Sequence, residues 1–260
     1  MTSNVLVTGG TGALGQVLVP RLLSAGADVS VLSRSAGAAP PGVRRRVADL
    51  TDADDAALAR ALQDVDTVVH LASDPAKPTS VDVQGTERLV TTAARSGVQH
   101  VVLLSIVGCD ANPFAYYRAK AAAEAVVLSG PVPGSVLRAT QFHDLVPRLA
   151  ETLVRGRVAF VPKGLRAQLV DLRDVADRLV TLVEAGPSGR VRDLAGPEVV
   201  TLPDAVTRWS RATGRSVPRV VHLPAVGRVL RSFAAGSNLP GPQAQLGRRT
   251  FDDWLRELSA

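Results

Sequence analysis

Short apolar runs and longer stretches of helical periodicity alternate along the first 140 residues of the chain. The runs are rich in Val and Leu, which favours buried strands, and the stretches between them carry apolar residues three and four positions apart. We expect strands at residues 4–8, 29–32, near 47, 67–71, 100–105 and 135–138, and helices at 16–25, 54–62, 83–96 and 116–128. This alternation predicts an α/β fold with a doubly wound parallel sheet whose ligands lie beyond the carboxyl ends of the strands.

The pattern is less regular after residue 140, where Pro and Gly turns separate shorter amphipathic stretches. We expect helices at residues 144–154, 175–184, 203–213 and 251–258, a strand near 158–161, and a last core strand at 168–171. We interpret residues 1–142 as a nucleotide-binding core to which 167–185 adds a strand and a helix. Residues 143–166 and 186–260 then form a small lobe that covers the substrate.

Composition and charge narrow the class of protein. Hydrophobic residues make up 46% of the chain, which suffices for a packed core and excludes disorder and coiled coil. The net charge is +6, from 30 Lys and Arg against 24 Asp and Glu, and the arginines are scattered among acidic residues. Because the densest basic run is only Arg44, Arg45 and Arg46, we predict no nucleic-acid partner and a basic surface that tolerates anionic small molecules.

Cysteine content and hydropathy bear on the compartment. The single cysteine, Cys109, excludes an internal disulfide and fits a reducing environment. No segment reaches the roughly 18 apolar residues of a membrane span, and no basic residues precede an apolar stretch at the N-terminus. We therefore expect a cytoplasmic protein, monomer or homodimer, with no membrane partner.

A glycine-rich turn follows the first expected strand directly. Three glycines spaced by two residues lie between that strand and a helix, a context that favours a dinucleotide over a plain turn. Glycines let the backbone approach a pyrophosphate, and the helix N-terminus offers free N–H groups and a positive dipole. The spacing fits equally whether the first glycine of the motif is Gly9 or Gly10. We assign to the cofactor Thr8, Gly9, Gly10, Thr11, Gly12, Ala13, Leu14 and Gly15.

The end of the second expected strand indicates which dinucleotide binds. Ser33 and Arg34 stand where an acidic residue would hydrogen-bond a ribose 2′-OH, and a guanidinium there suits a 2′-phosphate instead. We therefore predict NADP(H); the alternative is a solvated loop arginine. Asp49 is placed to accept from the adenine amino group, or to act as a cap or surface carboxylate. The remaining cofactor positions that we predict are Leu50, Leu71, Ala72 and Ser73.

The only two tyrosines of the chain, Tyr116 and Tyr117, precede one of its three lysines, Lys120. Residues i and i+4 share a helix face, so Tyr116 and Lys120 are expected to point into the same cleft. A nearby cation lowers the pKa of a phenol and makes it a usable acid or base. Ser105 ends the preceding strand, where its hydroxyl can bind a substrate oxygen. Tyr117, at i+3 from the lysine, stays an alternative, and so does a plain aromatic packing pair.

Three residues after the sixth expected strand are candidates for substrate binding. They are Gln141, Phe142 and His143, and for His143 a buried structural imidazole is an equal alternative. The four histidines show no recognisable metal-ligand spacing, so we predict no metal. Asp171 and Asp174 are interpreted as a strand-end residue and a helix N-cap.

These motifs together resemble the short-chain dehydrogenase/reductases. The resemblance rests on the glycine motif, His70-Leu71-Ala72, Gly85-Thr86, Ser105, Tyr116-x-x-x-Lys120 and Leu137-Arg138-Ala139-Thr140. The resemblance runs over nearly the whole chain. Within the family, the chain is most similar to the atypical, NmrA-like NAD(P)H-binding branch. Features of the extended branch are Asp171-x-x-Asp174-Val175-Ala176 and Ala195-Gly196-Pro197-Glu198. The chain offers no counterpart of the helix asparagine that completes the proton relay in many family members.

The resemblance implies a Rossmann-type doubly wound parallel sheet with a small C-terminal substrate lobe. It also implies that Lys120 holds the nicotinamide ribose, that Tyr116 exchanges the proton, and that hydride moves between nicotinamide and substrate. The leading hypothesis is an NADPH-dependent reductase of a small, largely apolar carbonyl or quinone-like compound. A non-catalytic NADP(H)-sensing regulator is the alternative, and a sugar-nucleotide epimerase or dehydratase is a weaker one.

Overall fold

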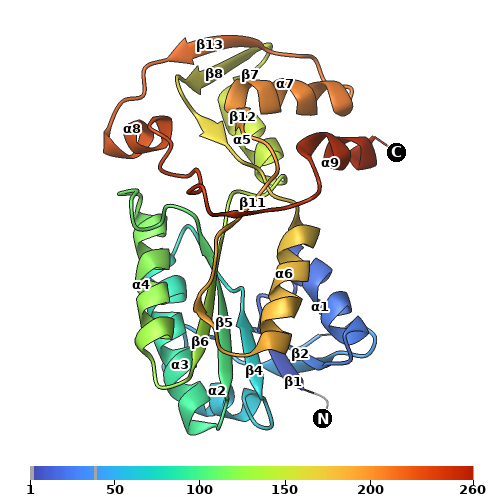
Figure 1. Ribbon diagram of the computed structural model, residues 1–260, viewed down its shortest axis with the longest axis vertical. Coiled ribbons are helices and arrows are strands. Elements are labelled where there is room, and N and C mark those ends of the chain that lie inside the picture. Colours follow the sequence, from blue (N-terminus) through green and yellow to red (C-terminus); the bar gives the residue numbers. More distant parts are fainter. Residues whose placement is uncertain (1–2, 38–39, 260) are drawn as a thin grey trace. The chain divides into compact units, whose positions relative to one another are not determined.

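The computed structural model describes residues 3–37 and 40–259, and the chain divides into two compact units (Figure 1). Each unit is assembled from three separate stretches of sequence. The first comprises Met1–Ser105, Ala115–Arg138 and Val175–Val191, and the second comprises Ile106–Phe114, Ala139–Asp174 and Arg192–Ala260.

A parallel sheet forms the centre of the first unit. Its strands are β1 (Asn4–Thr8), β2 (Asp28–Ser33), β3 (Arg44–Val47), β4 (Thr67–His70), β5 (His100–Ile106), β6 (Gly134–Ala139) and the short β10 (Gly189–Arg190). The spatial order is β3-β2-β1-β4-β5-β6, and β10 pairs with β6. β1 lies parallel to both β2 and β4. The chain direction across the sheet reverses between β1 and β4, so their carboxyl ends flank the place where open α/β sheets bind ligands.

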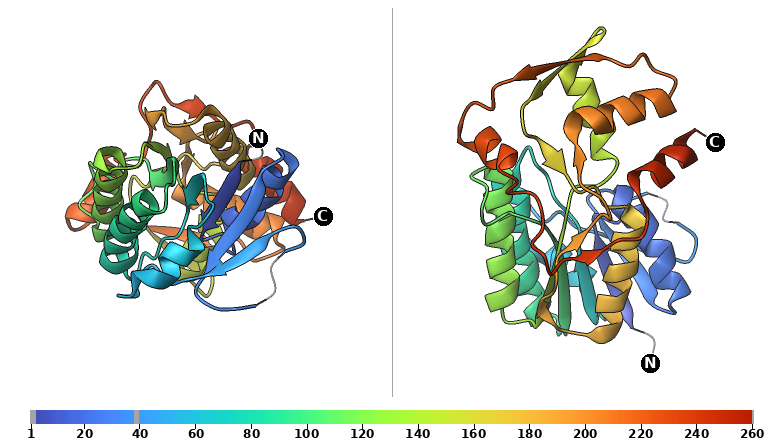
Figure 2. Two further views of the ribbon diagram at one scale, coloured as in Figure 1. Left: turned by 90° about the horizontal axis from the view of Figure 1, so that it is seen from below. Right: turned by 45° about the horizontal axis from the view of Figure 1, so that its top comes forward.

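Helices cover both faces of this sheet (Figure 2). One face carries α1 (Ala13–Ser24) and α6 (Leu172–Ala185), and the other carries α2 (Asp55–Ala61), α3 (Gly85–Arg95) and α4 (Ala115–Ser129). Arg21 of α1 and Asp177 of α6 form an ion pair at 2.7 Å. Leu6, Val68 and Leu103 are fully buried in the core between sheet and helices. The doubly wound parallel sheet predicted from the sequence is confirmed.

The helix expected at residues 83–96 begins earlier than its apolar pattern indicates. A π-helical turn, η1 (Thr79–Gln84), precedes α3 and runs into it. Pro78 is the N-cap of this turn, a place where its missing N–H costs nothing. Single π-turns often occur at functional sites, and this one carries the buried carboxylate of Asp82.

The second unit combines short strands with helices. The helices are α5 (Leu145–Leu153), α7 (Leu202–Ala212), α8 (Arg228–Ala234) and α9 (Phe251–Leu258). β8 (Val158–Pro162) lies between β13 (Arg219–Leu223) and β7 (Val154–Arg155), and the other strands are β9 (Arg166–Ala167), β11 (Leu194–Ala195), β12 (Val200–Thr201) and β14 (Gln245–Leu246). In the ranges that the structure describes, no helix has the length and apolar character needed to cross a bilayer.

The strand expected at residues 168–171 does not form. Val170 makes one isolated parallel bridge with Phe142. The backbone of this segment bonds to loop residues, because Val170 N donates to Gln141 O at 2.9 Å and Gly196 N donates to Gln168 O at 3.4 Å. The neighbouring segment turns into α5 instead of continuing as a strand, so the ladder ends after one bridge.

The stretch 106–114 is tied to residues near the C-terminus within the second unit. Asn112, which is buried, donates from Nδ2 to Ser237 Oγ at 2.9 Å. Gly108 has φ +79°, and a Cβ there would lie 1.7 Å from the carbonyl oxygen of Ser237. Only glycine fits this contact, because both the backbone conformation and the space exclude a side chain.

Candidate active site

The glycine turn after β1 is packed too closely for any side chain. A Cβ on Gly15 would lie 2.4 Å from Gly10 Cα, and one on Gly9 would lie 2.8 Å from Ala72 N. Gly9 also has φ +68°, which favours glycine. The turn therefore brings α1 against β1 and lays the β1 loop against the backbone that follows β4.

The N-terminus of α1 is open to an anion. Gly12 is its N-cap in extended conformation and has no side chain to cap the first turn. Thr11, Gly12 and Ala13 are exposed, whereas Gly15 is buried. Free N–H groups and a positive helix end at the switch point of a parallel sheet fit the phosphates of a dinucleotide. The predicted glycine motif thus stays a candidate site for the phosphates of a dinucleotide.

A chain of hydrogen bonds joins the ends of β1 and β4. Thr8 Oγ1 accepts from the N–H groups of Leu71 and Ala72 at 3.2 and 3.1 Å and lies 2.7 Å from His70 Nδ1. On its other side, His70 Nε2 lies 3.0 Å from Thr86 Oγ1, which donates to the carbonyl of Asp82. A neutral imidazole with its proton on Nε2 satisfies every member of this chain. Burial, followed by the charge of Lys120, lowers the pKa of His70 to about 3.

This lowered pKa predicts a loss of stability in mild acid. Below the ordinary histidine pKa of 6.5 the unfolded chain takes up a proton that folded His70 refuses, so the free energy of unfolding falls as the pH falls from 6.5 toward 3. We expect the His70 contribution to this loss between pH 7 and pH 5 to be about 2 kcal/mol in urea unfolding. His70→Asn should remove that part of the slope, while exposed His222→Asn, the matched control, should keep it. Equal slopes in wild type and His70→Asn would contradict the prediction.

Arg45 of β3 adds a cation at the end of β2, and the sequence analysis does not assign this residue to the cofactor. Ser33 is half-buried and Arg34 is exposed, as a contact with a ligand requires. Arg45 Nη1 donates to Ser33 Oγ at 3.2 Å and to the carbonyl of Ser35 at 3.4 Å. A cavity of about 340 Å³ near β3 is lined by Arg44, Arg45, Arg46, Val47, Ala57, Arg60 and Ala61. This edge of the sheet is therefore strongly basic.

Asp49 follows β3 and caps its own turn. Its Oδ1 accepts from the N–H and the hydroxyl of Thr51, both at 2.8 Å. The backbone hydrogen bond of Thr51 is the main cause that lowers the pKa of Asp49, and the charges of Arg34 and Arg88 add to it. Oδ1 is thus occupied by the turn. Leu50, the next predicted cofactor residue, is buried.

Tyr116 and Lys120 belong to one hydrogen-bonded cluster in the first unit. The hydroxyls of Tyr116 and Ser73 lie 2.9 Å apart, and Ser73 Oγ donates to Asp82 Oδ1 at 2.6 Å. The same Oδ1 lies 3.5 Å from Lys120 Nζ. Lys120 and Asp82 are buried and Tyr116 is half-buried, while Ser73 is exposed. Tyr117 is buried, 5% exposed, which favours Tyr116 as the phenol that a substrate can reach.

The pKa of Tyr116 is raised in the structure, whereas the sequence analysis expects the nearby Lys120 to lower it. Burial raises the pKa of Tyr116, the hydrogen bond with Ser73 lowers it, and the negative charge of Asp82 raises it further, so the pKa is raised overall. The expectation of a lowered pKa is wrong for this arrangement because burial of the phenol raises its pKa most, and the charge of Asp82, which lies 3.5 Å from Lys120 Nζ, acts in the same direction. The phenol is therefore held in the protonated form, which is the form that donates.

The helix that carries Tyr116 and Lys120 is fixed one turn further on. Glu124 of α4 accepts two hydrogen bonds from Arg138 of β6, at 2.8 and 2.7 Å, and both side chains are buried. Ser105 is buried. It is the penultimate residue of β5 and the last residue of the first stretch of the first unit. A buried, bidentate pair of this kind sets the position of α4 against the sheet.

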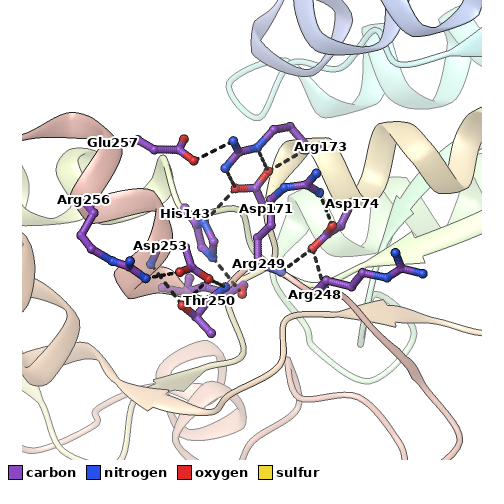
Figure 3. A network of polar contacts seen from close by, with 11 residues as sticks. His143, Asp171, Arg173, Asp174, Arg248, Arg249, Thr250, Asp253, Arg256 and Glu257 are labelled. Atoms are coloured by element: carbon purple, nitrogen blue, oxygen red, sulfur yellow. Dashed lines mark hydrogen bonds and ion pairs between the residues drawn. The ribbon is translucent and has the colours of Figure 1, made fainter. Parts of the chain in front are cut away.

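His143, predicted as a substrate contact, lies inside the second unit (Figure 3). It is 2% exposed, its Nδ1 lies 3.6 Å from Asp171 Oδ2, and its ring packs on Phe251 and Trp254 with centroids 5.5 and 5.7 Å away. These contacts favour the structural role that the sequence left open. Gln141 and Phe142 are half-buried and remain more accessible.

Asp171 and Asp174 anchor different partners in the same network (Figure 3). Asp171 accepts from the Arg173 backbone N–H and guanidinium, each at 2.8 Å. Burial raises the pKa of Asp171, but the hydrogen bonds from Arg173 outweigh it and hold the pKa well below its usual range. Asp174 accepts from the backbone of Arg248 and Arg249, so it fastens the segment before α9 and is not the N-cap that the sequence suggests.

With this geometry established, residues 9–185 match a protein family described as NAD(P)H-binding. The chain belongs to this family. The glycine turn, His70 and the Tyr116–Lys120 helix all lie inside the matched region. The short-chain dehydrogenase/reductase resemblance is confirmed, and as a member of that superfamily the protein is an NAD(P)-dependent oxidoreductase.

Relatives of this NAD(P)H-binding protein include a (4-alkanoyl-5-oxo-2,5-dihydrofuran-3-yl)methyl phosphate reductase of Streptomyces griseus. It is 34% identical over 97% of each chain. Among solved structures, a nucleoside-diphosphate-sugar epimerase of Staphylococcus aureus superposes with TM-score 0.77 at 18% identity, covering 97% of this chain and 99% of the other. An NADPH-dependent quinone oxidoreductase of Escherichia coli, solved with NADPH, gives 0.76 at 17% identity, covering 98% and 99%. At these identities the structures show the fold alone.

Proposed function

We propose that this NAD(P)H-binding protein reduces a small, largely apolar carbonyl or quinone-like compound with NADPH, and that Tyr116 donates the proton. The observation that carries the proposal is the cluster of Tyr116, Ser73, Asp82 and Lys120, which places a half-buried phenol at one end of a chain of polar contacts and a buried cation at the other. The reductase activity of the Streptomyces relative supports it.

The residues of the first unit divide into binding and proton-donating groups. When bound, the dinucleotide supplies the hydride. The glycine turn and the N-terminus of α1 would hold its phosphates, and Lys120 would hold its ribose, as the family resemblance implies. Tyr116 gives its phenolic proton to the substrate oxygen, which becomes a hydroxyl, and Ser105 donates a hydrogen bond to that oxygen. The substrate contacts predicted at Gln141 and Phe142 stay predictions.

Preference for NADPH over NADH is assigned to the end of β2. Arg34 and Ser33 present a guanidinium and a hydroxyl that suit a 2′-phosphate, and Arg45 holds the Ser33 hydroxyl in place. We expect Arg34→Ala to raise the Kd for NADPH by about tenfold or more, the equivalent of one charge-assisted hydrogen bond, and to change that for NADH much less. Titration calorimetry with each cofactor measures the two affinities.

Arg44→Ala is the matched control for this substitution. Arg44 lies on the same edge of the sheet and pairs with Asp28 at 2.7 Å. Its removal lowers the charge equally and should weaken both cofactors to the same small extent. Equal losses of NADPH and NADH affinity in Arg34→Ala would remove the case for phosphate recognition at this position.

A substrate screen that follows the loss of NADPH absorbance tests the proposed reaction. The panel should contain ketones, quinones and the (4-alkanoyl-5-oxo-2,5-dihydrofuran-3-yl)methyl phosphate on which the Streptomyces relative is named. Turnover of a member of the panel supports the reductase. NADPH binding with no turnover across the panel would favour the second candidate, an NADP(H)-sensing regulator that uses the same glycine turn.

A further inference from the structure

Asp82 is a buried carboxylate to which neither the sequence analysis nor the family resemblance gives a role. Its side chain is fully buried in the π-turn η1. Oδ1 accepts from Ser73 Oγ at 2.6 Å and lies 3.5 Å from Lys120 Nζ, while Oδ2 accepts from Asp74 N at 3.2 Å. Removing a carboxylate from water costs several kcal/mol unless it is paired and hydrogen-bonded. The contacts of Asp82 supply that pairing. Two of them are with Ser73, whose hydroxyl lies against that of Tyr116, and with Lys120.

The donors and acceptors in this cluster have one consistent direction. An ionised carboxylate only accepts, so the single proton of the Ser73 hydroxyl points to Asp82. The Tyr116 hydroxyl must then donate to Ser73 Oγ, 2.9 Å away. At rest the order is therefore from Tyr116 to Ser73 to Asp82, and Lys120 lies against the far end of the chain.

We propose that Asp82 and Ser73 are positioning residues for Tyr116, and that the Ser73 hydroxyl switches between two acceptors during the reaction. This inference rests on the proposed function, in which Tyr116 is the proton donor. At rest Ser73 accepts from the phenol and donates to Asp82. Once the phenolic proton has moved to the substrate oxygen, Ser73 turns its own proton to the phenolate. No bond in Ser73 or Asp82 is broken, and the carboxylate keeps Lys120 and Asp74 N as partners.

Charged groups around Tyr116 support this role. Asp82 faces it from η1, Lys120 lies on its own helix, and His70 of β4 stays neutral because its pKa is about 3. The Asp82 charge raises the pKa of Tyr116 and the Ser73 hydrogen bond lowers it. The two positioning residues therefore act on the phenol in opposite directions, which gives each a separate signature.

A pH titration of the phenol measures both signatures without cofactor or substrate. The chain has two tyrosines, so Tyr117→Phe leaves Tyr116 as the sole source of phenolate absorbance. In that background Asp82→Asn should lower the apparent pKa of Tyr116, because the opposing charge is gone and Lys120 is no longer offset. Ser73→Ala should raise it, because the phenolate loses its donor, and Ser73→Thr, which keeps a hydroxyl, should restore it toward the parent value.

Asp177→Asn provides the matched control, since it removes the same charge from an exposed site on α6. It should leave the Tyr116 titration unchanged. Circular dichroism at each pH confirms that the variants are folded, and Ser73→Ala, at an exposed position, keeps the test decisive if Asp82→Asn does not fold. An unchanged or raised pKa in Asp82→Asn, or an unchanged or lowered one in Ser73→Ala, overturns the inference.

Kinetics add a readout that separates positioning from binding. Ser73→Ala should lower kcat about tenfold on an active substrate at saturating NADPH. A loss in NADPH affinity with kcat unchanged would place Ser73 in cofactor binding alone and overturn the switch. Because the titrations need no turnover, they can fail while the reductase activity stands, and the reductase can fail while they succeed.

Discussion

Tyr116→Phe is expected to lower turnover at least tenfold, and by about a hundredfold if the phenol supplies the full benefit of a general acid. The substitution removes the hydroxyl that meets Ser73 and keeps the ring, so the packing of α4 is preserved. Affinity for NADPH should stay nearly the same, because the glycine turn and the end of β2 are untouched. Steady-state rates and a cofactor titration on one preparation measure both quantities.

The neighbouring tyrosine supplies the matched control. Tyr117 is buried and its ring meets that of Tyr116 edge to face at 6.4 Å, so Tyr117→Phe keeps the aromatic contact. We expect this variant to retain most of the turnover. Unchanged turnover in Tyr116→Phe would reject Tyr116 as the donor, and a large loss confined to Tyr117→Phe would transfer the role to the other phenol.

Arg138→Met is expected to reduce the free energy of unfolding by about 3 to 5 kcal/mol. The substitution leaves the Glu124 carboxylate buried without the guanidinium that donates to both of its oxygens. Breaking a buried ion pair on one side costs this much because the remaining charge is neither hydrated nor neutralised. Urea unfolding at pH 7 measures the loss, and we expect the position of Lys120, one turn before Glu124, to be disturbed with it.

A surface ion pair gives the contrast for this prediction. Arg44 and Asp28 meet at 2.7 Å, but their side chains are 57% and 39% exposed. Arg44→Met should therefore cost less than about 1 kcal/mol. If Arg138→Met proves as mild as Arg44→Met, the interior around α4 must admit water, and the buried pair would not be what fixes the helix.

Periodicity in the sequence suffices for the long elements of the fold. Strands such as β5 are nearly continuous apolar runs, which is typical of a parallel sheet covered on both faces. Helix α9 has the predicted bounds because an amphipathic stretch coincides with a capping box between Thr250 and Asp253. The sequence analysis does not predict β13 and α8. It also misses the strands β10, β11, β12 and β14, which have two residues each, too few to show any period.

The candidate site is only partly readable from the sequence. The spacing of Tyr116 and Lys120 is a local signal, because a helix brings i and i+4 together. Asp82 gives no such signal, because an aspartate in a helical stretch is ordinarily solvated. Its burial follows from the π-turn and from contacts with Ser73, in the preceding loop, and with Lys120, on a later helix. Arg45 reaches Ser33 across two parallel strands, a contact that only the register of β2 and β3 reveals.

The composition of the first unit from three stretches limits how the protein can be shortened. A truncation after Ala139 would keep β1 to β6 but delete the part of α6 that belongs to this unit. This part of α6 contains Val175, Leu179 and Leu182, each at most 1% exposed, and its loss would expose an apolar face of the sheet. The first unit therefore cannot be produced as one continuous segment of the chain, and measurements of nucleotide affinity require the intact polypeptide.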